Sequence, residues 1–349
     1  MMQKLTYEVR FVTPAFLGNA EQKGQWRTPP FKALIREWWR VVKAKDIGYD
    51  HEKLREEEGH LFGAAHDEGG GSQKSRMLVR ISEWNDGVLK QWPNDPRVKH
   101  SEVDKGGGNI GAHLYLAYGP LTYTKGVGTA LKDAHPAIES NKTTKLSLVY
   151  PDFFTDDIDN AIKLINWFGT VGGRSRNGWG SLMLSGDGIA HDIDLKIVAQ
   201  FSRPLADCLR LDWPHAFGKD EKGLLIWKTK NNFHTWEDIM KALAAIKIEF
   251  RTALPFKQVT PGAFEKRHVL AYPVTNHPVH KWGNQSRLAN QLRFKVALVN
   301  GKFRGIAYHL PCSAPRELML KIDQSDANDQ AAIWKIVHDN LNAHMDRIG

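Results

Sequence analysis

The sequence contains only two cysteines, Cys208 and Cys312, among its 349 residues. Two thiols are too few for a disulfide framework or for a zinc site built from cysteines. No apolar run approaches the roughly 18 residues of a membrane-spanning helix, and the opening segment MMQKLTYEVRFV lacks the apolar stretch of a secretory signal. These absences predict a soluble protein of the reducing cytoplasm, without a membrane partner.

Recognisable catalytic motifs are also missing. The sequence has no G-x-x-x-x-G-K-[ST] phosphate loop, and no serine–histidine, cysteine–histidine or paired-carboxylate set stands out. His277 and His280 have Pro278 between them and no acidic residue at a helpful spacing, so they are more typical of loop histidines than of metal ligands. We therefore predict no catalytic residues, no metal and no cofactor, and we interpret the protein as not an enzyme.

What the sequence does contain is positive charge and tryptophan. The formal net charge is +9, the sequence pI is about 9.3, and there are twelve tryptophans. A basic protein favours polyanionic partners, although charge alone does not identify them. Of the chain, 42% is hydrophobic and 25% is charged, which is ordinary for a globular protein long enough to form two domains.

The segment from Arg27 to Lys43 predicts a helix with two different faces. Thr28 can cap the helix, and Pro29 fits its first position. At about 100° per residue, one stripe is apolar and suits a core, namely Phe31, Ile35, Trp38 and Val42. A second stripe is basic, namely Lys32, Arg36, Arg40 and Lys43.

Trp39 is expected to project onto this basic stripe, where an aromatic ring among cations could stack on a base. A single nucleic acid strand binds such a surface because the cations meet its phosphates. The alternative is a core helix with a solvated basic face, in which Trp39 packs against a neighbouring loop.

A second informative segment is GTVGGRSRNGWGSL, residues 169–182, which has five glycines and two arginines. Glycine allows backbone amides to approach a phosphate, and arginine adds charge-assisted hydrogen bonds. Gly172, Gly173, Arg174 and Arg176 are therefore candidate ligand-binding residues. The alternative is a tight structural turn whose arginines are merely solvated.

Alternation and capping signals predict an α+β fold. We expect strands over Leu5–Val12, Met77–Trp84, His113–Tyr118, Thr144–Tyr150, Ser181–Leu184 and Ile193–Phe201. Further helices are expected from Thr155 to Gly169, from Thr235 through Ile246, and from about Asn328 to His344. Asn300-Gly301 predicts a hairpin turn within Leu292–Leu310, and residues 85–142 are expected to form long functional or mobile loops.

This order of elements predicts two tandem ferredoxin-like, RRM-like domains, each an antiparallel sheet with helices on one face. The expected boundary lies near residue 190, after SGDGIAHD, which gives domains of 1–190 and 191–349.

Several segments together resemble the RAMP superfamily of CRISPR systems. They are TPAFLGNA at 13–20, RTPPFKALIREWWR at 27–40, LFGAA at 61–65, GGRSRNGWGSL at 172–182, LDWPHAFG at 211–218 and RLANQLRFKV at 287–296. Within that superfamily, the sequence is most similar to the family of first subunits of the type III-B (Cmr) effector complex. The matching segments lie in both halves of the chain, whereas residues 85–142 carry none of them.

The resemblance implies two ferredoxin-like RAMP domains and membership of a ribonucleoprotein with guide RNA and other CRISPR effector subunits. It further implies a non-catalytic subunit that binds guide RNA, single-stranded target RNA or both, with target cleavage assigned to another subunit. The candidate RNA-binding residues are Arg27, Lys32, Arg36, Trp39, Arg40, Lys43, Gly172, Gly173, Arg174 and Arg176.

Two alternatives remain open at the level of the sequence. One is a metal-dependent RAMP endoribonuclease, which would use a loop carboxylate such as Asp104. The other is a purely structural subunit whose basic patch contacts acidic protein.

Overall fold

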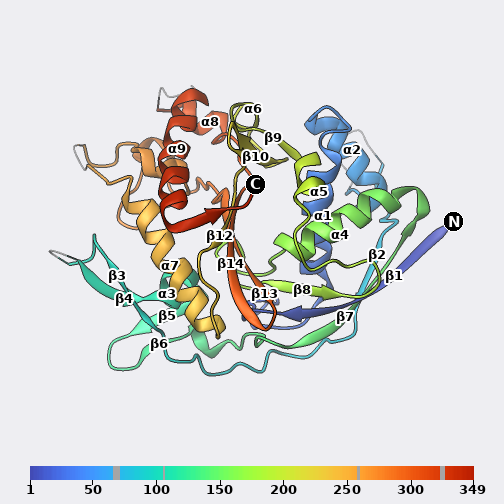
Figure 1. Ribbon diagram of the computed structural model, residues 1–349, viewed down its shortest axis with the longest axis horizontal. Helices are drawn as coiled ribbons and strands as arrows, with labels where there is room; N and C mark the ends of the chain where they lie inside the picture. Colours follow the sequence, from blue (N-terminus) through green and yellow to red (C-terminus); the bar gives the residue numbers. More distant parts are fainter. Residues whose placement is uncertain (66–70, 105–106, 258–259, 323–326) are drawn as a thin grey trace.

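The first half of the chain forms a four-stranded antiparallel sheet. The structure is a computed structural model, and it describes residues 1–65, 71–104, 107–257, 260–322 and 327–349. The sheet has the order β2-β7-β1-β8, with strands β1 (Met2–Phe11), β2 (Leu78–Ile81), β7 (Thr143–Pro151) and β8 (Leu182–Ser185). Helices α1 (Thr28–Lys43) and α4 (Thr155–Phe168) lie on one side of it (Figure 1).

A second sheet in the other half repeats this connectivity. Its order is β13-β14-β12-β15, with strands β12 (Ile226–Thr229), β13 (Leu292–Val299), β14 (Lys302–His309) and β15 (Met345–Arg347). Helix α7 (Trp236–Thr252) follows β12, and α9 (Ala327–His344) precedes β15. In both halves the chain therefore runs β-α-β-β-α-β with the fourth strand beside the first, which is the ferredoxin-like arrangement. The predicted fold class is confirmed.

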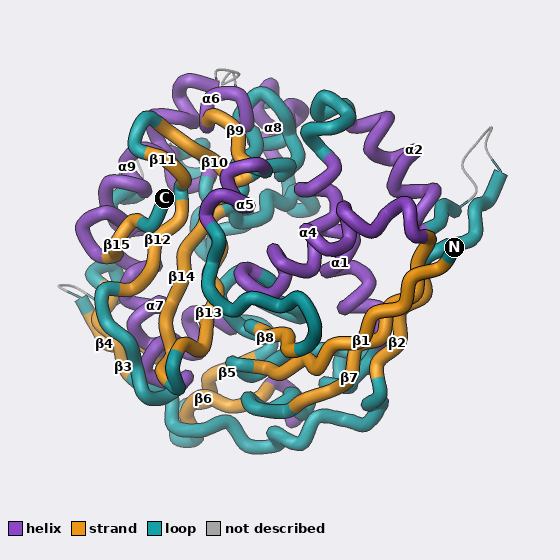
Figure 2. The backbone as a smooth tube through the Cα atoms, turned by 45° about the vertical axis from the view of Figure 1, so that its right-hand side comes forward, coloured by secondary structure: helices purple, strands orange, loops and turns teal. Residues whose placement is uncertain are grey.

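Smaller elements surround the two sheets (Figure 2). The remaining helices are α2 (His51–Phe62), α3 (Ala112–Ala117), α5 (Leu195–Gln200), α6 (Leu205–Cys208) and α8 (Arg316–Leu320). The remaining strands are β3 (Arg97–His100), β4 (Gly108–Gly111), β5 (Leu121–Thr124), β6 (Gly128–Leu131), β9 (Ser202–Pro204), β10 (Phe217–Asp220) and β11 (Gly223–Leu224). No helix in the described ranges combines the length and the apolar character that crossing a bilayer requires.

Capping and turn residues in the sequence predicted the position of several elements correctly. Helix α4 begins at Thr155 and ends before Gly169, as expected. The hydroxyl of Thr235 accepts a hydrogen bond from the backbone N–H of Asp238 and caps α7, which continues beyond the expected Ile246. Asn300 and Gly301 both have positive φ and join β13 to β14, which confirms the predicted hairpin.

Two predicted strands are wrong, because capping side chains make these segments helical. In place of a strand over His113–Tyr118, the chain forms α3, whose first N–H groups donate to the carboxylate of Asp95. In place of a strand over Ile193–Phe201, it forms α5, capped by Asp194. The cap of α3 comes from a distant residue, so hydrophobic alternation within the helix could not indicate it.

Residues 85–142 are more ordered than the expected loops. Their described part contains the hairpins β3–β4 and β5–β6 and helix α3. Helix α3 and strand β3 contact α7 of the second half (Figure 1). This region therefore belongs to the junction between the two halves.

The two halves also share aromatic core residues. Trp38 of α1 lies 5.8 Å from Phe217 and 6.0 Å from Tyr308, measured between ring centroids. Trp38 is 1% exposed, so its predicted place on the apolar stripe is confirmed. Because the cores are continuous, the division of the chain near residue 190 stays a prediction.

Candidate nucleic-acid interface

The basic stripe of α1 makes its contacts within the molecule. Glu58 of α2 is buried and accepts hydrogen bonds from the guanidinium groups of both Arg36 and Arg40. Burial disfavours the Glu58 carboxylate, but the hydrogen bonds from Arg40 and Arg36 outweigh it and hold the pKa of Glu58 below its usual value. Helix α2 thus supplies the counter-charge for these two arginines.

The other cations of this segment are occupied as well. Lys32 donates to the hydroxyl of Ser75 at 2.8 Å, and Lys43 forms a salt bridge of 3.3 Å with Asp157. Arg27 donates to the carbonyl oxygen of Gly18 at 2.7 Å. All five cations therefore have internal partners, although Arg36 and Arg40 keep 43% of their side-chain surface exposed.

The prediction that Trp39 lies exposed among the cations is wrong. Its side chain is 0% exposed, and its ring meets Phe62 of α2 edge-on at 5.6 Å between centroids. Helix α2 covers this face of α1, so the side chains that could have flanked a free ring are part of a helix–helix contact. Trp39 cannot offer a stacking surface to RNA in this conformation.

The glycine-rich segment after α4 is a tightly folded loop. Gly172 and Gly180 have positive φ, and a Cβ at Gly180 would lie 1.9 Å from the carbonyl oxygen of Val171. The N–H of Gly173 donates to the carbonyl oxygen of Phe16 at 2.8 Å, so it is used inside the protein. The glycines therefore serve a close backbone turn, which was the structural alternative for them.

Residues of the second half fix this loop in place. In β13, the N–H of Phe294 donates to the carbonyl oxygen of Arg176 at 2.9 Å. The buried ammonium group of Lys295 donates to the carbonyl oxygens of Gly169, at 2.6 Å, and of Leu182. Both ends of the loop are thus held by one lysine, whose pKa is lowered by burial.

The two arginines of the loop differ in their surroundings. Arg174 is exposed, its backbone has a φ of 56°, and its guanidinium has no hydrogen-bond or ion-pair partner among the described residues. Arg176 is half-buried and donates to the carbonyl oxygen of Asn290 at 3.4 Å. Near it, Glu37 of α1 forms a 2.6 Å salt bridge with Arg293, and the charges of Arg176 and Arg40 also act on Glu37.

Glu37 therefore connects the basic stripe of α1 with the glycine-rich loop, since the charges of Arg40 and Arg176 both act on it. Burial disfavours the charged form of Glu37, but Arg293, with Arg176 and Arg40, lowers the pKa of this carboxyl below its usual value. The connection is internal, however, and it leaves Arg174 as the unpaired cation of the predicted set within the described part of the chain.

An exposed aromatic residue that sequence reasoning missed lies beside Arg174. Tyr118 is 62% exposed and follows α3 directly. The guanidinium of Arg174 packs over the next residue, Gly119. A Cβ built on Gly119 would lie 3.3 Å from Nη2 of Arg174. Arg251 of α7 adds positive charge nearby. Lys247 of α7 adds little, because its ammonium group is buried and donates to Asn177 at 2.6 Å, and burial together with the charges of Arg251 and Arg174 holds its pKa well below the usual value. An exposed aromatic residue and a cation that has no partner among the described residues thus occur together here.

Carboxylates and histidines are not gathered in the same way. In the described ranges, no group of three or more His, Cys, Asp or Glu residues is arranged to hold a metal ion. Asp104, the loop carboxylate considered for a nuclease, is exposed and has a φ of 59°.

The likeness of this chain to known proteins is one of fold. No protein-family model matches the sequence, and no curated protein matches it. A chain of the type III-B Cmr-beta complex bound to cognate target RNA and AMPPnP, in the presence of ssDNA, aligns with a TM-score of 0.50 at 11% identity. The alignment covers 98% of this chain and 99% of that chain.

Two further structures align at lower scores. Cmr1 from Pyrococcus furiosus, in its apo form, aligns with a TM-score of 0.47 at 14% identity, over 97% of this chain and 96% of that chain. A chain of type III-B Cmr-beta bound to cognate target RNA aligns with a TM-score of 0.47 at 11% identity, over 96% and 100% of the two chains. The chain thus has a tandem ferredoxin-like fold that is similar to the fold of a chain in a type III-B Cmr complex.

Proposed function

We propose that this protein is a non-catalytic RNA-binding subunit of a type III-B CRISPR effector, at work in the cytoplasm. The full-length likeness of fold to a chain from a complex bound to cognate target RNA supports this proposal. The RAMP-like sequence segments and the net charge of +9 support it independently. Guide RNA, single-stranded target RNA and other effector subunits are the proposed partners.

The observation that carries the proposal is the guanidinium of Arg174, which has no partner among the described residues and packs over Gly119, the residue that follows the exposed Tyr118. A surface arginine that finds no carboxylate or carbonyl among the described residues is available for a phosphate. A base can stack on a tyrosine ring that is 62% exposed. The binding surface thus consists of the glycine-rich loop with Tyr118, and Arg251 contributes attraction without base-specific contacts.

The test is RNA binding by purified variants, measured by fluorescence anisotropy with labelled single-stranded RNA. Arg174→Ala is expected to weaken binding about 5–10-fold and to reduce the slope of log affinity against log salt by about 0.7, the value for one phosphate contact on a single strand. Tyr118→Ala is expected to cost about 1–3 kcal/mol of binding, whereas Tyr118→Phe keeps most of it, because stacking needs the ring and not the hydroxyl.

Lys53→Ala is the matched control for the loss of one charge. Lys53 lies on α2, on the other side of the molecule from α3, and its side chain is 69% exposed (Figure 1). This variant is expected to change affinity less than 2-fold, as suits a remote surface charge under salt screening. Equal effects of Arg174→Ala and Lys53→Ala would contradict the assigned surface.

The same samples test the absence of catalysis. RNA incubated with the protein and Mg²⁺ or Mn²⁺ is expected to stay intact on a denaturing gel. Divalent-dependent cleavage that is lost in Asp104→Asn would instead establish the endoribonuclease alternative.

A further inference from the structure

The first sheet has one face that α1 and α4 do not cover. These helices lie on the other face (Figure 1), where Tyr7 and Val9 of β1 are buried. Successive side chains of a strand point to opposite faces, so Thr6 and Glu8 point away from the helices, and both are exposed. We call the outward side chains of β1, β2, β7 and β8 the open face. Four of them are basic, namely Lys4, Arg10, Arg80 and Lys145.

Two small hydroxyl side chains form the floor of the open face. Thr6 lies opposite Ser147, and their hydroxyl oxygens are 3.2 Å apart. On the other side of β7, Arg80 of β2 lies opposite Ser147 in the same row. Lys145 precedes Ser147 by two residues, and Lys4 precedes Thr6 by two residues, so each lies about 7 Å along its strand from the floor. Three cations from three strands therefore surround two hydroxyl groups.

These three cations have no partner within the described part of the chain. Lys4, Arg80 and Lys145 are exposed, and their side chains form no hydrogen bond or salt bridge with a described residue. Glu8 lies opposite Lys145 in the register but forms no salt bridge with it, and it is the one carboxylate on the open face of the described strands. The open face therefore keeps a positive charge that an anion can neutralise.

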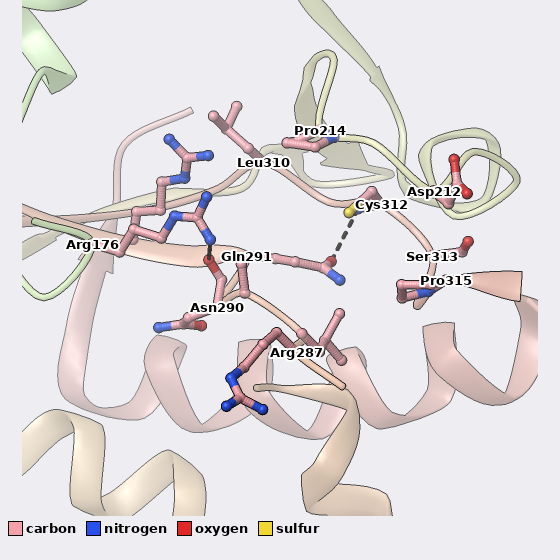
Figure 3. Close-up of a pocket in the computed structure, with 13 residues that line it drawn as sticks. Arg176, Asp212, Pro214, Arg287, Asn290, Gln291, Leu310, Cys312, Ser313 and Pro315 are labelled. Carbon is pink, nitrogen blue, oxygen red and sulfur yellow. Dashed lines mark hydrogen bonds between the residues drawn. The ribbon is translucent and has the colours of Figure 1, made fainter. Parts of the chain in front are cut away.

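The arginines around the cavity in Figure 3 do not converge in this way. The guanidinium of Arg287 points away from Arg176 there, and Arg293 is paired with Glu37 at 2.6 Å. The cavity thus lacks the arrangement of the open face, where cations without partners lie around one floor.

From this arrangement we propose that the open face binds backbone phosphates of an RNA strand, held by Lys4, Arg80 and Lys145. The inference rests on the proposed function and adds a second contact surface to it. Phosphate oxygens accept hydrogen bonds from ammonium, guanidinium and hydroxyl groups, so Thr6 and Ser147 can add contacts from the floor. The outward positions of β1 and β7 carry no aromatic side chain, so bases cannot stack there as they do on the sheet of an RNA recognition motif. The contacts are therefore expected to be independent of base sequence.

The size of the open face favours an RNA strand over a folded protein as its occupant. Strands about 4.8 Å apart, with a residue rise of about 3.4 Å, give this face an area of roughly 400 Å². A stable protein interface buries about 800 Å² on each partner, whereas a phosphate contact needs only a few side chains. The segment that follows β1 also leads to the glycine-rich loop, because the carbonyl oxygen of Phe16 accepts the N–H of Gly173 at 2.8 Å. One RNA strand is therefore expected to contact both surfaces.

The test is anisotropy with labelled single-stranded RNA and variants of the open face. Arg80→Gln combined with Lys145→Gln is expected to weaken binding at least about 10-fold and to lower the slope of log affinity against log salt by about 1.4, since each phosphate contact contributes about 0.7. Arg80→Lys keeps the charge and should keep most of the affinity. Glu8→Gln is expected to tighten binding about 2-fold, because it removes the carboxylate beside the cations.

Lys45→Gln combined with Lys53→Gln is the matched control for the loss of two charges. Both lysines are exposed, and they lie in α2 and in the segment before it, on the side of the sheet that α1 covers (Figure 1). This control is expected to change affinity less than about 2-fold. The proposal is overturned if both double variants, folded by circular dichroism, bind RNA alike, or if Glu8→Gln weakens binding.

Arg174→Ala separates this inference from the proposed function. If Arg174→Ala weakens binding and the double variant of Arg80 and Lys145 does not, the surface at the glycine-rich loop stands, the inference is overturned, and the open face is left for an acidic protein surface. If only the double variant weakens binding, the open face holds the strand and the assignment of Arg174 falls. If the wild type binds no RNA, the proposed function fails and the inference falls with it.

Discussion

Replacing Trp39 by alanine is expected to destabilise the protein and to leave its RNA surface unchanged. The indole is fully buried between α1 and α2 and packs edge-on against Phe62. A buried aromatic side chain removes about 150–250 Å² from water, which at about 25 cal/mol per Å² corresponds to roughly 4–6 kcal/mol. Measured tryptophan or phenylalanine to alanine changes in cores cost about 3–5 kcal/mol, so we expect a loss in that range.

The assays are urea unfolding and thermal unfolding, both followed by circular dichroism, with RNA anisotropy at a temperature where the variant stays folded. At roughly 2 °C per kcal/mol for a chain of this size, Tm should fall by about 6–10 °C. Trp84→Ala is the matched control, because Trp84 is 55% exposed and should cost no more than about 1 kcal/mol. Normal stability together with weaker RNA binding in Trp39→Ala would refute this reasoning and would return Trp39 to the RNA surface.

Two further predictions concern buried charges. The pKa of Glu58 lies below its usual value in the folded state, so its contribution is present above the unfolded pKa and is lost as pH falls through the folded pKa. The substitution Glu58→Gln should cost about 1–3 kcal/mol at neutral pH, because two half-exposed arginines lose a charged partner. Urea titrations at descending pH should therefore show a shallower loss of stability in this variant than in the wild type, and parallel curves would contradict this. Lys295→Met should cost about 2–4 kcal/mol, because two buried carbonyl oxygens lose their donor, and it should also weaken RNA binding in anisotropy. Lys302→Met, on the exposed end of the same hairpin, should do neither.

Elements that are determined by residues close together in the sequence could be predicted from it. Asn300-Gly301 determines its own turn, and Thr235 caps the helix that begins next to it. Helix α3 could not be predicted, because Asp95 caps it from 18 residues away. Its N-terminus is stabilised by a contact that exists only after folding.

The sequence likewise predicted one part of the candidate site and not the rest. The glycine-rich loop and its two arginines stood out by composition, since five glycines within a short segment are unusual for a simple turn. The faces of α1 were harder to assign, because a helical wheel gives directions but does not show which neighbour covers them. Glu58 and Phe62 of α2 cover the basic face, so Arg36, Arg40 and Trp39 contact the protein itself. Tyr118 was missed because its exposure depends on where α3 ends.

The contacts of β13 with the glycine-rich loop have a consequence for synthesis of the chain. The glycine-rich segment ends at residue 182, but the strand that fixes it, with Phe294 and Lys295, is translated more than a hundred residues later. Until the ribosome has released that strand, the carbonyl oxygens of Gly169 and Arg176 lack their partners, although β1, α1, β7 and α4 are already available to fold. A nascent chain should therefore acquire its first sheet early and the shape of its glycine-rich loop late. If the loop forms the proposed RNA surface, RNA binding by the nascent chain is expected only after β13 has been synthesised.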